Sequence, residues 1–281
     1  MKKLSSIIAT AFLMFGFASC DVIEEPYKKD NNGGGEEPNP EVVVKHVLLE
    51  DYTGVNCPNC PNAGQIALDI QEQYNHQVIV LGVHAGLAEM NVLPPTIPTF
   101  IDFRTPEGTE WYTHFGFDSN PIGTINRKSN GTTYGYGWGD WSETVANVIQ
   151  EEAMLEMSTE IEYNEATRNL KVDVKSEFLV EMPDTYSLTV CIMEDSIVAA
   201  QNQQGHGIIL DYVHRHVFRT TMNGTWGEDI NTTAIAPEDE IVKSYTTTLN
   251  ADYNADQCYI IAYVSNSNTK EILQVVEKKI K

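Results

Sequence analysis

Two cysteines in the stretch LLEDYTGVNCPNCPNAGQIALDI constrain the fold more than any other feature of the sequence. Cys57 and Cys60 stand two residues apart, where an apolar, strand-like run over residues 42–52 gives way to a helix-like run over residues 62–74. Residues 78–83 then form a second apolar run of the kind found in buried strands. This order predicts a parallel βαβ unit with the cysteine pair at the start of its helix.

The position of this C-x-x-C pair predicts redox chemistry. Unpaired N–H groups at a helix N-terminus stabilise a thiolate at Cys57, and Cys60 lies one turn further along, within reach of a mixed disulfide. The alternatives are a static disulfide that staples the helix start, or a metal pair. A closed zinc site needs four ligands, and the sequence contains neither a second C-x-x-C nor an H-x-x-x-H, so we expect no metal.

The N-terminus predicts export and lipidation. Lys2 and Lys3 precede an apolar run over residues 4–17, and small residues stand directly before Cys20. This is the pattern of a signal peptide, and its end resembles a bacterial lipobox in which the cysteine is acylated. We therefore expect residues 1–20 to comprise a lipoprotein signal peptide and its acylated cysteine, with simple secretion as the alternative.

Residues 21–41 are rich in Gly, Pro, Asn and Glu, and they predict a disordered tether between the membrane and the folded chain. Cleavage of the signal peptide would remove Lys2 and Lys3 and take the formal charge of the chain from −22 to −24. Such a surface repels phosphate backbones, which excludes nucleic acid as a partner. We expect a lipid-anchored protein of the cell envelope, in the outer membrane, with the periplasmic and surface faces both open.

The region after the βαβ unit is interrupted by prolines. Four prolines between residues 84 and 117 break every periodic pattern and predict an insertion. Residues 121–137 predict a hairpin with an Asn-Gly turn, and residues 141–157 predict an amphipathic helix. We therefore expect an α/β domain with an insertion over residues 42–157.

Beyond residue 158 the sequence changes to short alternating runs separated by turn residues. Such runs are typical of an all-β sandwich of the immunoglobulin-like kind, and we expect one over residues 158–281. Its candidate strands are STEIEYN, NLKVDVKSEF, YSLTVCIMED, HVFRTTM, IVKSYTTTLN, CYIIAYVS and EILQVVEK.

Two further positions resemble the thioredoxin superfamily. A buried aspartate of that superfamily precedes the first motif cysteine by six residues, and Asp51 stands at this spacing from Cys57. Its cis-proline faces the motif, and FGFDSNPIG places Pro121 there, whereas no hairpin follows the alternative, Pro98 in IPTF. The resemblance implies a thioredoxin-like domain in which Asp51 assists proton movement and Pro121 shapes a peptide-binding groove.

Three longer segments resemble the outer membrane protein 28-related lipoprotein family: LLEDYTGVNCPNCP, NPIGTINR and YVHRHVFRTTMNGTWG. The resemblance covers nearly the whole mature chain. It implies a thioredoxin-like domain followed by a β-sandwich in an envelope lipoprotein, and it suggests surface adhesion or receptor activity. This chain has Asn56 and Pro58 where the family motif has a bulky residue and a glycine.

Two functions fit these residues. In a thiol–disulfide oxidoreductase, Cys57 attacks the disulfide of a protein or peptide substrate and Cys60 resolves the mixed disulfide, with no dissociable cofactor. In the alternative, the redox fold is a scaffold and the chain is a non-enzymatic lipoprotein that binds a surface ligand. Redox direction and oligomeric state are open at this point.

The remaining cysteines and histidines allow weaker predictions. Cys191 and Cys258 fall in two predicted sandwich strands, where they either bridge or stay free. His214 and His216 point to one face of a strand, and with no matching carboxylate pair a structural role is favoured over a metal site. His84 ends the second strand of the βαβ unit and is placed to approach the cysteine motif.

Overall fold

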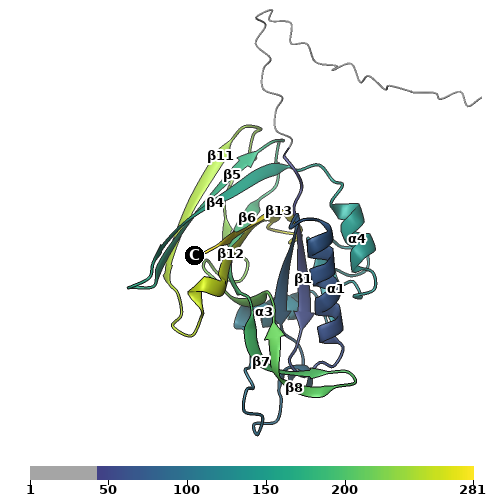
Figure 1. Cartoon of the computed structure of the whole chain (residues 1–281). Helices are drawn as coiled ribbons and strands as arrows, with labels where there is room; N and C mark the ends of the chain where they lie inside the picture. The colour runs from purple at the N-terminus through teal and green to yellow at the C-terminus, as the bar shows by residue number, and fades with distance from the viewer. Residues whose placement is uncertain (1–42) are drawn as a thin grey trace, which may run out of the picture. The chain divides into compact units, whose positions relative to one another are not determined.

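The cysteine motif lies in a parallel βαβ unit, built from β1 (Val47–Thr53), α1 (Cys60–Gln73) and β2 (Val78–His84) (Figure 1). The computed structural model describes residues 43–281, so the predicted signal peptide, Cys20 and the tether lie outside the described residues. Both strands are buried along almost their whole length, as expected for apolar runs in the middle of a sheet.

The described residues form one compact unit of many strands and few helices. The elements after β2 are α2 (Ala88–Asn91), α3 (Pro106–His114), β3 (Ile122–Ile125), α4 (Trp141–Val148), β4 (Leu155–Asn164), β5 (Asn169–Phe178), β6 (Tyr186–Glu194), β7 (Ile197–Gln203), β8 (Gly207–His214), β9 (Val217–Thr221), β10 (Glu228–Asp229), β11 (Glu240–Thr248), a 3₁₀ turn (Ala255–Gln257), β12 (Cys258–Asn266) and β13 (Ile272–Lys279).

The largest sheet joins strands from both halves of the chain. Its order is β13-β12-β6-β9-β2-β1-β3, and β10 pairs with β6. β1 runs parallel to β2 and antiparallel to β3, while β2 meets β9 at one residue pair, Gly82 and Val217. A Cβ on Gly82 would lie 3.3 Å from two backbone oxygens, so a glycine allows this close approach.

A second sheet, of order β11-β5-β4, packs against the β6 and β12 part of the large sheet (Figure 1). Strict alternation along β5 buries every second residue in the shared core, as is typical of a strand with one solvent-facing side. The core between the two sheets includes Leu155, Val172, Leu188 and Ile260. β7 and β8 form a separate two-stranded sheet.

Alternation along β1 sends its side chains to two different cores. Val47 and Leu49 pack with α1 and α4, whereas Leu48 and Tyr52 pack with α3 on the opposite face of the sheet. Asp51 lies on the same face of β1 as Val47 and Leu49, so its carboxyl points towards α1, the helix that begins at Cys60.

Two elements differ in extent from the sequence prediction. The helix expected over residues 141–157 ends at Val148, and β4 begins at Leu155, because pairing with β5 along its whole length extends the first strand backwards. In the expected hairpin of residues 121–137, regular strand structure covers only β3, and one bridge joins Gly123 to Tyr136. Tertiary pairing thus overrides the local pattern in both places.

Gly123→Ala is expected to lower the free energy of unfolding by about 1–3 kcal/mol, because the new methyl group overpacks the core. A Cβ there would lie 2.6 Å from the ring of Trp141, which is fully buried and donates its indole N–H to the Tyr136 carbonyl. Urea unfolding measures the change. Gly139→Ala is the matched control, since no atom lies within 4 Å of a Cβ at Gly139; an equal loss in both variants would contradict the packing argument.

Candidate functional site

Cys57 and Cys60 form a disulfide at the beginning of α1, with their Cα atoms 5.4 Å apart. Cys60 is the first residue of the helix, Pro61 follows it, and no side chain caps the helix at Asn59. The two cysteines are 1% and 3% exposed, whereas Pro58 and Asn59 between them are exposed to solvent. The pair therefore lies just below the protein surface.

Asp51 is a buried carboxyl close to the start of α1, the helix that begins at Cys60. Burial raises its pKa from 3.8 to about 7, and among the described residues its Oδ1 has no hydrogen-bond partner. Its Oδ2 would lie 3.9 Å from a Cβ on Gly64, one turn after Cys60, so the carboxyl lies at van der Waals distance from the start of the helix. A carboxyl with this pKa can accept or donate a proton near neutral pH.

Pro121 lies at the same end of the sheet, because Ile122 pairs with Tyr52 near the end of β1. The peptide bond between Asn120 and Pro121 is cis, and no other peptide bond in residues 43–281 is. The amide of Asn120 donates to the carbonyls of Thr53 (2.9 Å) and Ala85 (2.8 Å). These bonds fix the proline loop to the ends of β1 and β2.

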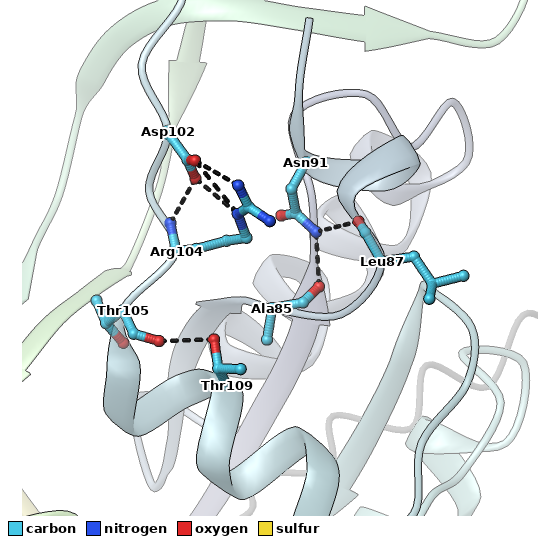
Figure 2. A network of polar contacts seen from close by, with 7 residues as sticks. All are labelled: Ala85, Leu87, Asn91, Asp102, Arg104, Thr105 and Thr109. Carbon is cyan, nitrogen blue, oxygen red and sulfur yellow. Dashed lines mark hydrogen bonds and ion pairs between the residues drawn. The ribbon is translucent and has the colours of Figure 1, made fainter.

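The short helix α2, in the insertion after β2, contacts the motif loop as well. Asn91 donates to the carbonyls of Ala85 and Leu87, which folds the short α2 back on β2 (Figure 2). The backbone N–H of Asn56 donates to the Met90 carbonyl at 2.8 Å. The motif loop is therefore held against α2 as well as against the sheet.

A cavity of about 450 Å³ lies beside the disulfide, between α1, the ends of β1 and β2, and β8. It includes Asp51 and Cys60 but not Cys57, and its polar lining is completed by His84, Gln201, Tyr212 and His214. The proximity to the motif that the sequence suggested for His84 thus appears as a shared cavity with Cys60.

The histidines of this region are neutral at pH 7. Burial lowers the pKa of His214 and of His216 to about 4, and the pKa of His84 well below its usual value. The rings of His84 and His214 lie 5.6 Å apart, centre to centre. No group of three or more His, Cys, Asp or Glu side chains arranged for a metal ion occurs in residues 43–281.

The hairpin of β7 and β8 lies on the motif loop, which sequence reasoning did not find. The side-chain amide of Gln201 donates to the carbonyls of Gly54 (3.3 Å) and Cys57 (3.2 Å), and the N–H of Asn202 donates to the Val55 carbonyl (2.8 Å). The run QNQQGHG carries a turn signal in its glycines, but nothing in it indicates contact with a motif more than 140 residues away.

Cys191 and Cys258, whose pairing the sequence left open, are both free and buried. They lie on neighbouring strands, but Cys191 pairs with Ile261 and Cys258 with Glu194, so the two thiols are out of register. Burial raises the pKa of Cys258 to about 12 and that of Cys191 further. Both thiols therefore stay protonated near neutral pH, and Cys57 and Cys60 form the one disulfide in residues 43–281.

Comparison with solved structures shows similar folds at low identity. HBP35 of Porphyromonas gingivalis matches with a TM-score of 0.65 and 16% identity, over 84% of this chain and 76% of that chain. A protein of Agrobacterium tumefaciens matches with a TM-score of 0.51 and 12% identity, over 86% and 97% of the two chains. At these identities the likeness bears on the fold alone.

The family comparison covers more than half of the chain. A domain of the outer membrane lipoprotein Omp28 from Porphyromonas gingivalis has 24% identity over 46% of this chain and 89% of that chain, with a TM-score of 0.33 that supports no argument about fold. No curated protein matches. Among the described residues, no helix is long and apolar enough to span a bilayer. The family model described as outer membrane protein Omp28 matches residues 109–281, and the chain belongs to this family.

Proposed function

We propose that this chain is an envelope lipoprotein, anchored through Cys20, whose Cys57–Cys60 pair exchanges disulfides with a protein or peptide partner. Membership of an outer membrane protein family supports a location in the cell envelope. The observation that carries the redox proposal is the disulfide at the start of α1, with the titratable carboxyl of Asp51 lining the same cavity as Cys60.

We further propose a specific fold for each of two parts of the chain. The parallel β1–α1–β2 unit, followed by an insertion, a cis-proline, β3 and α4, supports a thioredoxin-like domain over residues 42–157. The facing sheets support an immunoglobulin-like sandwich over residues 158–281. Strands β6, β9, β12 and β13 also continue the first sheet, so the two proposed domains share hydrogen bonds and core.

In the reductive direction, the Cys57 thiolate attacks one sulfur of the partner's disulfide. The partner's S–S bond breaks, a mixed disulfide forms, and one partner thiolate leaves and takes up a proton. Asp51 accepts the proton of Cys60, whose thiolate attacks the Cys57 sulfur and releases the second partner thiol. Two electrons pass from the pair to the partner. Oxidation of a partner dithiol follows the same steps in reverse.

The first test is the reduction potential of the pair in the chain that begins after Cys20, measured by glutathione titration with thiol trapping. We expect a value above about −250 mV, which is typical of exchangeable pairs. A value below about −300 mV would mean a structural disulfide.

The second test uses cysteine variants and a protein disulfide substrate. Cys57→Ser is expected to reduce exchange to the uncatalysed rate, because the attacking sulfur is lost. Cys60→Ser is expected to accumulate the mixed disulfide, because nothing resolves it. Cys258→Ala is the control, since its thiol is free and buried in the core between the facing sheets, and exchange is expected to continue. Equal activity in all three variants would refute the proposed role of the pair.

A second candidate function, non-enzymatic binding of a surface ligand, is favoured by the burial of both motif cysteines. In this case the disulfide only staples α1. A double variant, Cys57→Ser with Cys60→Ser, then retains ligand binding, while no variant shows exchange with a protein disulfide. The same set of proteins therefore separates the two functions.

A further inference from the structure

The β7–β8 hairpin occupies the hydrogen-bonding groups of the motif loop. Carbonyls at Gly54, Val55, Cys57 and Pro58 all accept bonds from it, through Gln201, Asn202 and the N–H of Gln204, which lies 2.9 Å from the Pro58 oxygen. Asn202 also donates from its side chain to the Asn56 side chain at 3.1 Å. The hairpin is thus bound along the loop that carries the attacking cysteine.

Gln201 is the buried centre of this contact. It is 2% exposed, and its single amide nitrogen lies within hydrogen-bond distance of the Gly54, Cys57 and Asn202 carbonyls. The pairing of β7 with β8 shifts register between Ala199 and Gln201, as at a β-bulge or a similar irregularity. Bulges re-aim side chains, and here the irregularity coincides with the residue that reaches the motif.

Cys57, which attacks the partner in the proposed reaction, is buried at this contact. Cys57 is 1% exposed and does not line the neighbouring cavity, whereas Cys60 does. A reacting partner therefore reaches Cys57 only if neighbouring segments move, and the hairpin bonded to its carbonyl is one of these segments. The exposed residues Pro58 and Asn59 show that the cover lies to one side of the loop and not over its tip.

The hairpin belongs to neither of the two larger sheets. β7 and β8 pair with each other in a sheet of their own. Four aliphatic side chains of the hairpin are exposed, namely Val198, Ile208, Leu210 and Val213. The inner side of β7 packs Ala199 and Ala200 against Val55, Leu93 and Phe103, so opening exposes this small cluster. A separate strand pair with a small buried apolar face is expected to open locally at a lower free energy than global unfolding.

We propose that the β7–β8 hairpin is a strap that closes over the Cys57–Cys60 pair, and that Gln201 is the positioning residue that holds it closed. The strap regulates the exchange reaction, so its biological meaning rests on the proposed function. The physical behaviour of the strap does not rest on that function, because the strap limits access to the Cys57 sulfur for any reductant, including a small one.

The experiment measures the rate at which dithiothreitol reduces the disulfide in native protein. Gln201→Ala is expected to be reduced at least about tenfold faster than wild type, because one or two buried hydrogen bonds that close the strap are lost. Gln204→Ala is the matched control: the same change on the same hairpin, at an exposed side chain, with its backbone bond to Pro58 retained. We expect it to be reduced at the wild-type rate.

Low concentrations of urea separate local opening from general loss of stability. Lifting a hairpin exposes little surface, so the reduction rate is expected to change little with urea below the unfolding transition. A rate that rises with urea as steeply as the unfolding equilibrium, or a Gln201→Ala variant reduced at the wild-type rate, would overturn the strap.

Amide hydrogen exchange gives a second measurement on the same variants. The N–H groups of Asn202 and Gln204, which donate to the Val55 and Pro58 carbonyls, are expected to exchange faster than those of the central strand β12, and faster still in Gln201→Ala. Exchange as slow as in β12 would contradict the strap.

The outcomes distinguish the two proposals. If Gln201→Ala accelerates reduction by dithiothreitol but no variant exchanges with a protein disulfide, the strap stands and the proposed function fails. If wild type exchanges with protein disulfides while Gln201→Ala reacts at the wild-type rate, the function stands and the strap fails.

Discussion

Arg127→Met is expected to lower the free energy of unfolding by about 3–5 kcal/mol, because it leaves the buried carboxylate of Glu50 without its partner. Glu50 is 0% and Arg127 1% exposed. The guanidinium binds both carboxylate oxygens, with Nε donating at 2.9 Å and Nη2 at 2.6 Å, and the hydroxyl of Thr124 donates to the carboxylate at 2.6 Å.

This ion pair stabilises the junction of several elements. Glu50 lies in the middle of β1, and Arg127 follows β3, its neighbour in the sheet. The guanidinium lies 4.7 Å from the ring centre of Trp111 in α3 and 5.1 Å from that of Tyr263 in β12. Removing it therefore also removes packing and cation–π contacts between the first strands and the C-terminal half of the chain.

Urea unfolding measures this loss against a matched arginine. Arg104→Met breaks the partly exposed pair with Asp102 (Figure 2), and we expect a change of less than about 1 kcal/mol. Replacing both buried partners, Glu50→Leu with Arg127→Met, is expected to restore much of the stability, since no unpaired charge remains. Equal losses for Arg127→Met and Arg104→Met would mean that water reaches Glu50.

Helices and strands were predicted correctly where the local sequence pattern indicates only one kind of secondary structure. The C-x-x-C pair between an apolar run and a helix predicted β1, α1 and β2, and all seven alternating runs beyond residue 158 are strands. The strands β7 and β8 were missed. After Ile197 and Val198, β7 consists of small and polar residues, and β8 is exposed on both faces along most of its length, so neither shows the alternation that marks a half-buried strand.

Long-range contacts account for what the sequence did not predict at the site. Asp51 and Pro121 were placed by spacing and by resemblance, and both lie at the end of the sheet that carries the motif. Gln201 had no comparable signal, because its role depends on where a hairpin folds. Glu50 resembles a solvent-facing charge in the sequence, and only its pairing with Arg127 explains its burial.

The pH dependence of stability follows from Asp51. Its pKa is about 7 in the folded chain and 3.8 when hydrated. Between these values the folded chain keeps a proton that the unfolded chain has released, so the contribution of Asp51 to stability is full below pH 3.8 and is lost as the pH rises through 7. A shift of this size corresponds to about 4 kcal/mol above pH 7.

Asp51→Asn is therefore expected to raise the free energy of unfolding by about 4 kcal/mol at pH 8 and to change it little at pH 4, because the amide stays neutral at both. Urea unfolding from pH 4 to pH 8 measures the free energy of unfolding of the variant and of wild type. Glu277, His214 and His216 titrate in both proteins, so their contributions cancel in the difference. Asp118→Asn, at an exposed carboxylate, is the control and should stay within about 0.5 kcal/mol.

The same variant links stability to the proposed chemistry. If Asp51 moves the proton of Cys60, Asp51→Asn gains stability at pH 8 and loses the inflection near pH 7 in the rate of disulfide exchange. A variant that gains stability but keeps the wild-type pH profile would show a carboxyl that is buried without taking part in exchange. A variant that gains no stability would show that water entering from the cavity beside Cys60 already hydrates the carboxylate. The free energy of unfolding thus measures what the burial of Asp51 costs, and the pH profile of disulfide exchange measures separately whether Asp51 transfers a proton.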